Sequence, residues 1–390
     1  MPEDGRGGSL PQSRLGVQRT FYPHVEGLRG VAALYVFLFH VWQAGIEHPA
    51  TATLALWFGA TWWLLQYGHF AVAAFIVISG FCLALPVAAG STLPFDPRRF
   101  FVRRARRLMP AYVAVVFLSI VPWCVTALME GHPVSPPHIA LATVMHLALI
   151  HNLFYATTEY LNGPLWTIAL ECQIYVAFAL LLIPVWRRFG LVAQLALALG
   201  LGLVPHYALH SLDWTLPWLL GLFALGVAAA SLAARDTVPR VPFGWLALAA
   251  TAITVLLVLP YREGITPDGA LWPADFAAGT AIALFFVAGA RNERLLPVRL
   301  LALRPVVLLG TFSYSLYLIH APLVDVTAAA LARLHAGVAA SALAYGVLVP
   351  LVLALAYAFY RGFERPFMSK EFRRAIELQT ESPGAVAVAC

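Results

Sequence analysis

Two ionisable side chains lie inside long apolar stretches of this 390-residue sequence, and together they could move a proton. His40 falls in the first apolar stretch and Glu171 in the fourth. An ionisable group near the middle of a membrane helix costs about 2.5–3.5 kcal/mol, so each needs a partner or a function. An imidazole is a natural general base for a hydroxyl, and a carboxylate beside it could orient it or stabilise its protonated form.

Arg29 precedes His40 by eleven residues. Eleven residues make almost three helical turns and about 16 Å of rise. Both side chains are therefore predicted on one face of the first helix, with Arg29 at its cytoplasmic end. The helix of Glu171 runs the other way and places this carboxylate about 10 Å below the outer surface, at a depth similar to that of His40. The alternative is that both groups only join helices through hydrogen bonds.

Six arginines gather between Arg98 and Arg107, just before the third apolar stretch. Arg103, Arg104 and Arg107 are predicted to share one helical face, where guanidinium groups could bind a phosphorylated donor through paired hydrogen bonds. For the outer members of the cluster, the alternative is anchoring at the cytoplasmic surface and contact with lipid headgroups.

A polar stripe crosses a later apolar stretch. Ser313, Tyr317 and His320 recur at spacings of four and three residues, so they share one helical face and could line a pocket for an acceptor. The alternative for the tyrosine is an aromatic belt at the membrane surface. Glu364 and Arg365 are interpreted as a local ion pair that ends the last helix, and the four cysteines show no metal-ligand spacing.

The elements that position these residues must be membrane helices. The chain is 61% hydrophobic and 11% charged, with a mean hydropathy of +0.78, whereas a soluble domain carries about 25% charge. Apolar runs near 20 residues, the length that crosses a bilayer, predict an all-α bundle of about ten spanning helices. They cover residues 28–46, 70–89, 111–129, 164–186, 191–209, 213–232, 242–260, 271–289, 305–324 and 341–360.

Two further apolar stretches, 51–67 with a Gln and 138–155 with His and Asn, are interpreted as interfacial or re-entrant. With ten spans and a cytoplasmic N-terminus, every Lys and Arg except Arg262 and Arg333 falls on the cytoplasmic side. This asymmetry is the positive-inside signal. It predicts that both termini are cytoplasmic and that the net charge of +6 reflects topology, not nucleic-acid binding.

The predicted organisation is a cytoplasmic segment over 1–27, one transmembrane domain over 28–366 and a cytoplasmic tail over 367–390. The expected location is the cytoplasmic membrane, that is, an inner or plasma membrane, in contact with membrane lipids. The sequence leaves the oligomeric state open.

Several of these motifs, in this order, resemble the acyltransferase-3 family of integral membrane O-acyltransferases. The resemblance runs from about Tyr22 to Met368. Its pieces are Glu26-Gly-Leu-Arg29 with His40, Phe75 to Phe81, Phe100 to Arg104 with Arg107 and Pro110, Leu165-Trp166 with Glu171 and Tyr175, Phe312 to His320, and Glu364-Arg-Pro. One departure is Glu26, where the family usually has Asp.

The resemblance implies that His40 is the catalytic histidine, with Arg29 as its motif partner and Glu171 as a core acidic residue. It implies that Arg104 and Arg107 bind an acyl-CoA donor, and Arg103 is expected to join them. The acceptor or pocket residues are then expected to be Trp166, Tyr175, Ser313, Tyr317 and His320.

The predicted reaction moves an acetyl or short acyl group from cytoplasmic acyl-CoA, with acetyl-CoA the first candidate, to a hydroxyl of a glycan or glycoside. Acyl-CoA is a co-substrate, and no permanently bound cofactor or metal is expected. The competing hypothesis is a membrane transporter of a lipid-linked or sugar substrate that uses His40 and Glu171 as a proton relay. We find no internal repeat of the kind many transporters carry.

Overall fold

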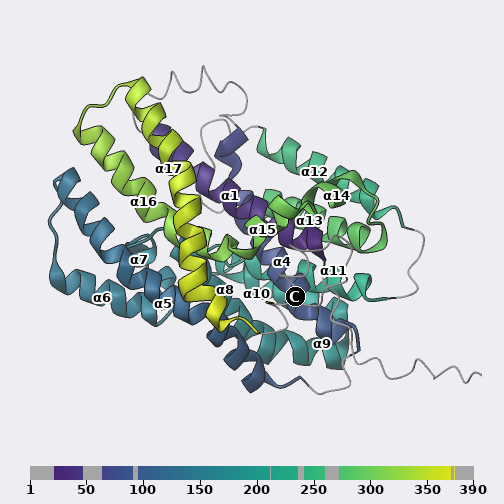
Figure 1. Ribbon diagram of the computed structural model, residues 1–390. Helices are drawn as coiled ribbons and strands as arrows, with labels where there is room; N and C mark the ends of the chain where they lie inside the picture. Colours follow the sequence, from purple (N-terminus) through teal and green to yellow (C-terminus); the bar gives the residue numbers. More distant parts are fainter. Residues whose placement is uncertain are drawn as a thin grey trace, which may run out of the picture.

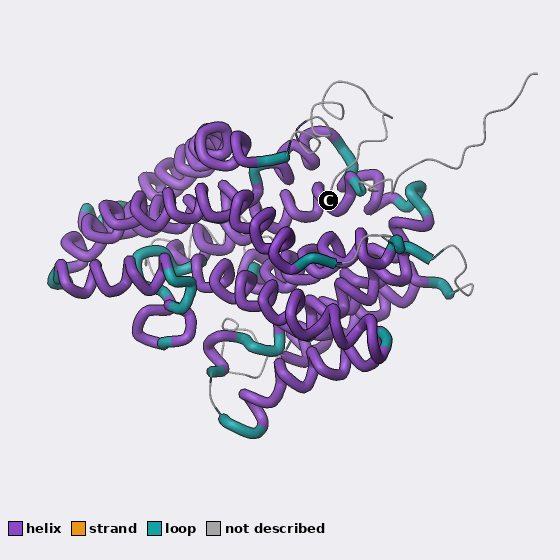
Figure 2. The backbone as a smooth tube through the Cα atoms, turned by 90° about the horizontal axis from the view of Figure 1, so that it is seen from below, coloured by secondary structure: helices purple, strands orange, loops and turns teal. Residues whose placement is uncertain are grey.

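The computed structural model describes residues 22–46, 64–90, 95–210, 212–235, 241–259, 272–369 and 373. Within these ranges every regular element is helical and there is no strand (Figures 1 and 2). Eight helical segments are long and apolar enough to cross a membrane. The predicted all-α, multi-span fold is confirmed. The ends of the chain, segment 51–63 and Arg262 lie outside the described residues.

The eight segments contain the long helices α1 (Pro23–Ile46), α4 (His69–Ala88), α5 (Pro97–Glu130), α8 (Leu165–Ala177), α11 (Leu219–Ala233), α13 (Trp272–Arg291), α16 (Ser313–Arg333) and α17 (Val338–Phe359). The count of about ten depends on two shorter apolar helices, α10 (Leu191–Tyr207) and α12 (Phe243–Val258). At 17 and 16 residues they rise about 24–26 Å, less than the ~30 Å hydrocarbon core.

Shorter elements complete the chain. They are α6 (Pro136–Leu147), α7 (Tyr155–Thr158), α9 (Ile183–Phe189), α14 (Leu296–Leu301), α15 (Arg304–Thr311), the 3-10 turns η1 (Leu65–Tyr67), η2 (His151–Leu153), η4 (Asp213–Thr215) and η6 (Arg365–Phe367), and the π-helical turns η3 (Phe178–Leu182) and η5 (Tyr360–Glu364).

The arginine-rich stretch forms the first part of α5, which continues into the predicted third span. Asp96 caps this helix, because its side chain accepts a hydrogen bond from the backbone N–H of Arg99, and Pro97 occupies the first helical position. The helix ends at Gly131, whose φ of 81° lies in the left-handed region. The arginines are therefore held on a continuous helix of 34 residues.

The bounds predicted for the span over 305–324 are wrong. The chain breaks at Phe312 (φ −114°, ψ 15°) into α15 and α16, and α15 packs against α1. The polar stripe from Ser313 to His320 consequently begins the spanning helix α16. Figure 1 shows α16 running beside α17.

Helix α4 lies at the centre of the bundle and contacts α1, α11 and α13. Most of its side chains are buried. By contrast, α12 and α17 expose large apolar side chains, such as Leu256 and Leu343, which is the surface that a membrane protein presents to lipid.

Helices α4 and α11 touch through their backbones. A Cβ added at Gly80 would lie 2.1 Å from the carbonyl oxygen of Phe223, and one at Gly226 would lie 2.2 Å from that of Val77. Small residues of this kind let membrane helices approach closely. Neither position has room for a methyl group.

Replacing Gly80 with Ala is therefore expected to lower the melting temperature in detergent by several degrees, because overpacking of this kind costs about 1–3 kcal/mol. Gly346→Ala in α17 is the matched control, since a methyl group added there would meet no atom within 4 Å. The control should keep or raise the melting temperature. Equal melting temperatures for the two variants would show that the close contact does not matter.

The second ambiguous stretch, 138–155, does not form a spanning helix. Helix α6 has 12 residues and is followed by the short turn η2, so the prediction that this stretch does not cross the membrane agrees with the structure. The buried rings of His146 and His151 stack here with centroids 3.7 Å apart. Burial and the neighbouring imidazole lower the pKa of His151 to about 3.

This pair should make stability depend on pH. Unfolded His151 takes up a proton below about pH 6.5, whereas the folded protein resists protonation until about pH 3. The contribution is thus complete above pH 6.5 and declines as the pH falls toward 3. We expect His151→Phe to show a smaller drop in melting temperature between pH 7.5 and pH 5 than the wild type. The exposed His138→Phe is the control, and identical pH profiles for wild type and His151→Phe would contradict the expectation.

Candidate active site

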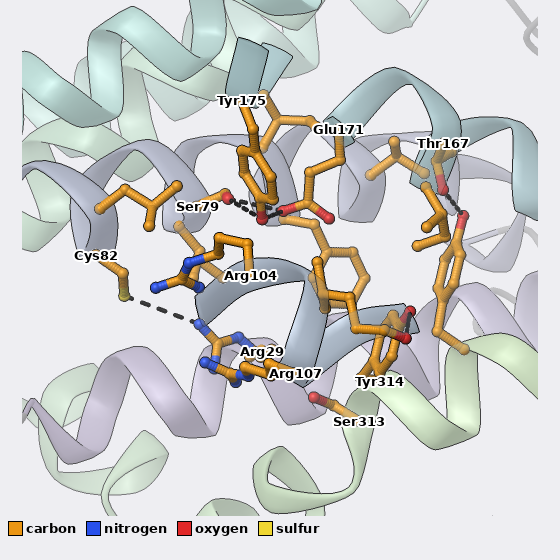
Figure 3. A pocket seen from close by; sticks show the side chains of 18 residues that line it. Arg29, Ser79, Cys82, Arg104, Arg107, Thr167, Glu171, Tyr175, Ser313 and Tyr314 are labelled. Carbon is orange, nitrogen blue, oxygen red and sulfur yellow. Dashed lines mark hydrogen bonds between the residues drawn. The ribbon is translucent and has the colours of Figure 1, made fainter. Parts of the chain in front are cut away.

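A partly open cavity of about 100 Å³ lies where five helices meet, α1, α4, α5, α8 and α16. Figure 3 shows its polar side chains converging from these helices. The chemically functional lining residues are Arg29, Ser79, Cys82, Arg104, Arg107, Thr167, Glu171, Tyr175, Ser313, Tyr314 and Tyr317. The sequence motifs of five distant segments therefore meet at one place.

Glu171 forms the acidic side of this cavity. Its carboxylate accepts a hydrogen bond of 2.7 Å from the hydroxyl of Ser79 and another from the hydroxyl of Tyr175, one turn further along α8. The two hydroxyls are also 3.1 Å apart. The cluster joins α4 to α8 and leaves the carboxylate facing the cavity (Figure 3).

Three arginines form the basic side. Arg29 pairs with Glu26 on the preceding turn at 2.9 Å, so the longer acid at this position still reaches the arginine. Arg104 and Arg107 project into the cavity from α5. Within the described part of the chain, the guanidinium of Arg104 has no hydrogen-bond partner, although it interacts electrostatically with Glu171. A cation held in this way is suited to bind an anionic ligand.

Arg103 does not join this group. Its side chain is exposed and does not line the cavity. Arg103 lies about 100° around the helix axis from Arg104, at the edge of the face that the three arginines were predicted to share. The predicted three-arginine face is thus reduced to two.

His40 lies in a second polar cluster, with His320. The Nε2 of His320 is 3.2 Å from the Nδ1 of His40, and the ring centroids are 4.9 Å apart. Each Nδ1 also lies near the backbone carbonyl four residues earlier, that of Val36 for His40 at 2.8 Å and that of Leu316 for His320 at 3.0 Å. His320 is fully buried, while His40 is partly exposed.

Tyr317 lies at the boundary between the two clusters. It lines the cavity, its hydroxyl is 2.7 Å from that of Thr167, and its ring packs against Phe75 and His320 with centroids 5.6 and 5.7 Å away. Neither histidine lines the cavity. The ring of Tyr317 therefore separates His320 from the carboxylate side.

The expected contact between His40 and Glu171 is not found in the structure. Glu171 bonds to Ser79 and Tyr175, and His40 bonds to Val36 and His320. Both residues were placed by their distance along a helix, which fixes depth but not the direction in which a side chain points. The rotation of each helix about its own axis turns them to different partners.

The remaining predicted pocket residues divide into two groups. Tyr175, Ser313 and Tyr317 line the cavity, whereas Trp166 is half-buried outside it and His320 belongs to the histidine pair. Ser313 is held by a hydrogen bond of 2.7 Å from its hydroxyl to the carbonyl of Gly310.

Sequence reasoning missed several residues of the site. Ser79, Cys82, Thr167 and Tyr314 line the cavity, yet each is a common residue in an apolar helix. Glu364 was interpreted only as part of a local ion pair that ends a helix, and its burial against α16 was not predicted. Its side chain is 1% exposed and accepts a hydrogen bond of 2.7 Å from Ser315 of α16. Arg107 and Arg29 lie close enough to interact with it electrostatically.

Comparison with known proteins adds a family. Residues 22–361 match the model of a family described as an acyltransferase domain. The chain is 27% identical to transacylase BcsY of Komagataeibacter xylinus over 97% of this chain and 92% of that protein. No solved structure matches the chain.

Two further relatives share less of their length. O-acetyltransferase OatA of Staphylococcus aureus is 24% identical over 78% of this chain and 51% of its own length. Peptidoglycan O-acetyltransferase OatA of Listeria monocytogenes is 23% identical over 79% of this chain and 50% of its own length. The chain thus spans about half the length of these two proteins and nearly all of BcsY.

Proposed function

Because this chain belongs to the acyltransferase-3 family of membrane O-acyltransferases, we propose that it transfers an acetyl or other short acyl group from acyl-CoA to a hydroxyl of a glycan or glycoside. The observation that carries this proposal is the meeting of the family's motifs around one cavity, with Arg104 facing into it from the arginine-rich end of α5.

The cavity supports the donor half of the proposal. Arg104 and Arg107 offer the guanidinium groups that bind phosphate through paired hydrogen bonds. The cavity of about 100 Å³ is large enough for a short acyl group. Glu171 offsets the arginine charge when no donor is bound.

The histidine pair supports the acceptor half. His40 Nε2 takes the proton of the acceptor hydroxyl while the hydroxyl oxygen attacks the carbonyl carbon of the thioester. The carbon–sulfur bond then breaks, and the CoA thiolate takes the proton back from the imidazolium. The products are an ester and free CoA. Tyr317 separates this pair from the cavity, so the transfer requires its ring to move aside.

The acceptor class is inferred from relatives. One of them is named a peptidoglycan O-acetyltransferase, and we extend a glycan acceptor to this chain as part of the proposal. The acyl-CoA donor is inferred from the basic cavity and the family resemblance, since no relative's name states a donor.

The test is an assay with the purified full chain in lipid vesicles. Radiolabelled acetyl-CoA is added with peptidoglycan fragments, and both ester-linked label and free CoA are measured. We expect free CoA to appear in step with label on the fragments. If the fragments instead cross the membrane while acetyl-CoA stays intact, the transporter hypothesis replaces this one. If neither occurs, the masses of surface glycans from cells with and without the chain are compared, and a glycan that loses an acyl group in cells without the chain identifies another acceptor.

The transporter hypothesis requires a connected proton path between His40 and Glu171. Among the described residues, no hydrogen bond links the two clusters, because Tyr317 bonds to Thr167 and to the carbonyl of Pro164. The structure therefore gives less support to a relay between these groups than to two sites with separate roles.

A further inference from the structure

The contacts of His40 and His320 fix which nitrogen of each ring carries the hydrogen. A backbone carbonyl can only accept, so the Nδ1 of His40 beside the carbonyl of Val36 must be an N–H donor. The same reasoning applies to the Nδ1 of His320 beside the carbonyl of Leu316. When both rings are neutral, each Nε2 is left with a lone pair.

The two rings then differ in what their Nε2 atoms meet. The lone pair of His320 Nε2 faces the Nδ1–H of His40 at 3.2 Å. The Nδ1–H of His40 is therefore shared between two acceptors, the carbonyl of Val36 and the Nε2 of His320. All polar atoms of the fully buried His320 are thus engaged by protein. On His40, in contrast, Nε2 has no partner within the described ranges and the ring is partly exposed.

We propose that His320 is a positioning residue for His40. It holds the His40 ring with Nδ1–H directed inward and the basic Nε2 directed to the acceptor hydroxyl. This inference rests on the proposed function, and it assigns to a second histidine the orienting role that was expected of Glu171.

The proposal explains how the pair responds to the chemical step. When His40 Nε2 takes the acceptor proton, the positive charge makes its Nδ1–H a stronger donor, and the hydrogen bonds to Val36 and to His320 Nε2 shorten and strengthen. No proton has to move between the rings. The aromatic rings of Phe37 and Tyr317, with centroids 5.9 and 5.7 Å from that of His320, fix the position of His320.

Two matched variants test the role in the acetyl-transfer assay. His320→Phe keeps a ring of similar size but cannot accept a hydrogen bond, whereas His320→Gln places an amide oxygen near the position of Nε2. We expect His320→Phe to lower kcat at least tenfold with an unchanged KM for acetyl-CoA, and His320→Gln to recover most of the loss. Melting temperatures establish that both variants fold.

Two results would overturn the assignment. One is a His320→Phe variant whose kcat stays within twofold of wild type, and the other is a His320→Gln variant that loses as much as His320→Phe. A nuclear magnetic resonance experiment on ¹⁵N-histidine protein provides a readout that needs no enzyme activity. A coupling through the hydrogen bond should link one Nδ1 to one Nε2 and vanish in His40→Gln and in His320→Phe.

These measurements separate the two levels of the proposal. Wild-type protein that transfers no acyl group to any acceptor removes the proposed function and the catalytic role of His320 with it, whatever the spectrum shows. If the wild-type protein is active but the coupling is absent, or if His320→Phe leaves kcat unchanged, only the positioning role is removed.

Discussion

Replacing His40 with Gln is expected to lower the rate of acetyl transfer by 100-fold to 10,000-fold, the range that a general base contributes. The amide of Gln can still form a hydrogen bond, but it cannot take a proton from the acceptor hydroxyl at neutral pH. The measurement is the rate of ester formation by purified protein in lipid vesicles at saturating acetyl-CoA. Binding of acetyl-CoA should change little, because His40 lies outside the arginine-lined cavity.

His132→Gln is the matched control. His132 is 70% exposed and touches neither cluster, so its replacement should leave the rate within twofold of wild type. A folded His40→Gln protein that transfers acetyl groups within tenfold of the wild-type rate would show that His40 is not the base. Equal loss in both variants would point to a general effect of histidine replacement on the protein.

Replacing Arg104 with Met is the second large effect that the structure predicts. A hydrogen bond to a charged group contributes about 1.5–3 kcal/mol, which corresponds to roughly 10-fold to 150-fold in kcat/KM for acetyl-CoA. The long apolar side chain of Met fills the same space, so the variant should fold. Equilibrium binding of CoA to the purified protein should weaken by a similar factor.

The neighbouring Arg103 provides a strict control. Arg103→Met removes the same charge one residue away on α5, but from an exposed side chain that does not reach the cavity. We expect CoA binding within about twofold of wild type. If Arg103→Met weakens binding as much as Arg104→Met, the arginines act through their overall charge at the membrane surface, and the cavity is not the donor site.

Much of the fold could be predicted from apolar runs alone. A bilayer demands long uncharged helices, and these leave a clear signal in the sequence. The signal fails where a helix continues into charged sequence, as α5 does. The Asp96–Pro97 pair at its start is a helix-capping signal that could have revealed the true beginning.

The break between α15 and α16 was harder to predict from the sequence. It occurs within an apolar stretch and depends on the packing of α15 against α1, where a Cβ on Gly310 would lie 2.2 Å from the carbonyl oxygen of Glu26. Such a close approach between helices is a tertiary property, and hydropathy carries no information about it.

The sequence predicted which residues form the site better than it predicted the contacts between them. His40 and Glu171 were selected because charge is costly within apolar sequence, and the arginines Arg29, Arg104 and Arg107 were selected by helical spacing and family resemblance. The structure places each of the five in one of the two clusters. Their partners depend on helix rotation, which a single sequence does not reveal. The burial of Glu364 was not predicted, because a charged residue at the end of an apolar run has the same appearance whether it is solvated or buried.

The glycine contacts also limit how the bundle can deform. Where backbones lie so close that no methyl group fits between them, as in α4 against α11 and α1 against α15, one helix cannot slide past the other without a collision of main-chain atoms. Each of these pairs is therefore a stiff unit. No glycine contact of this kind holds α5, α8 or α16 among the described residues, and we expect any widening that lets a bulky molecule reach the cavity to come from these three helices, which carry most of its polar residues.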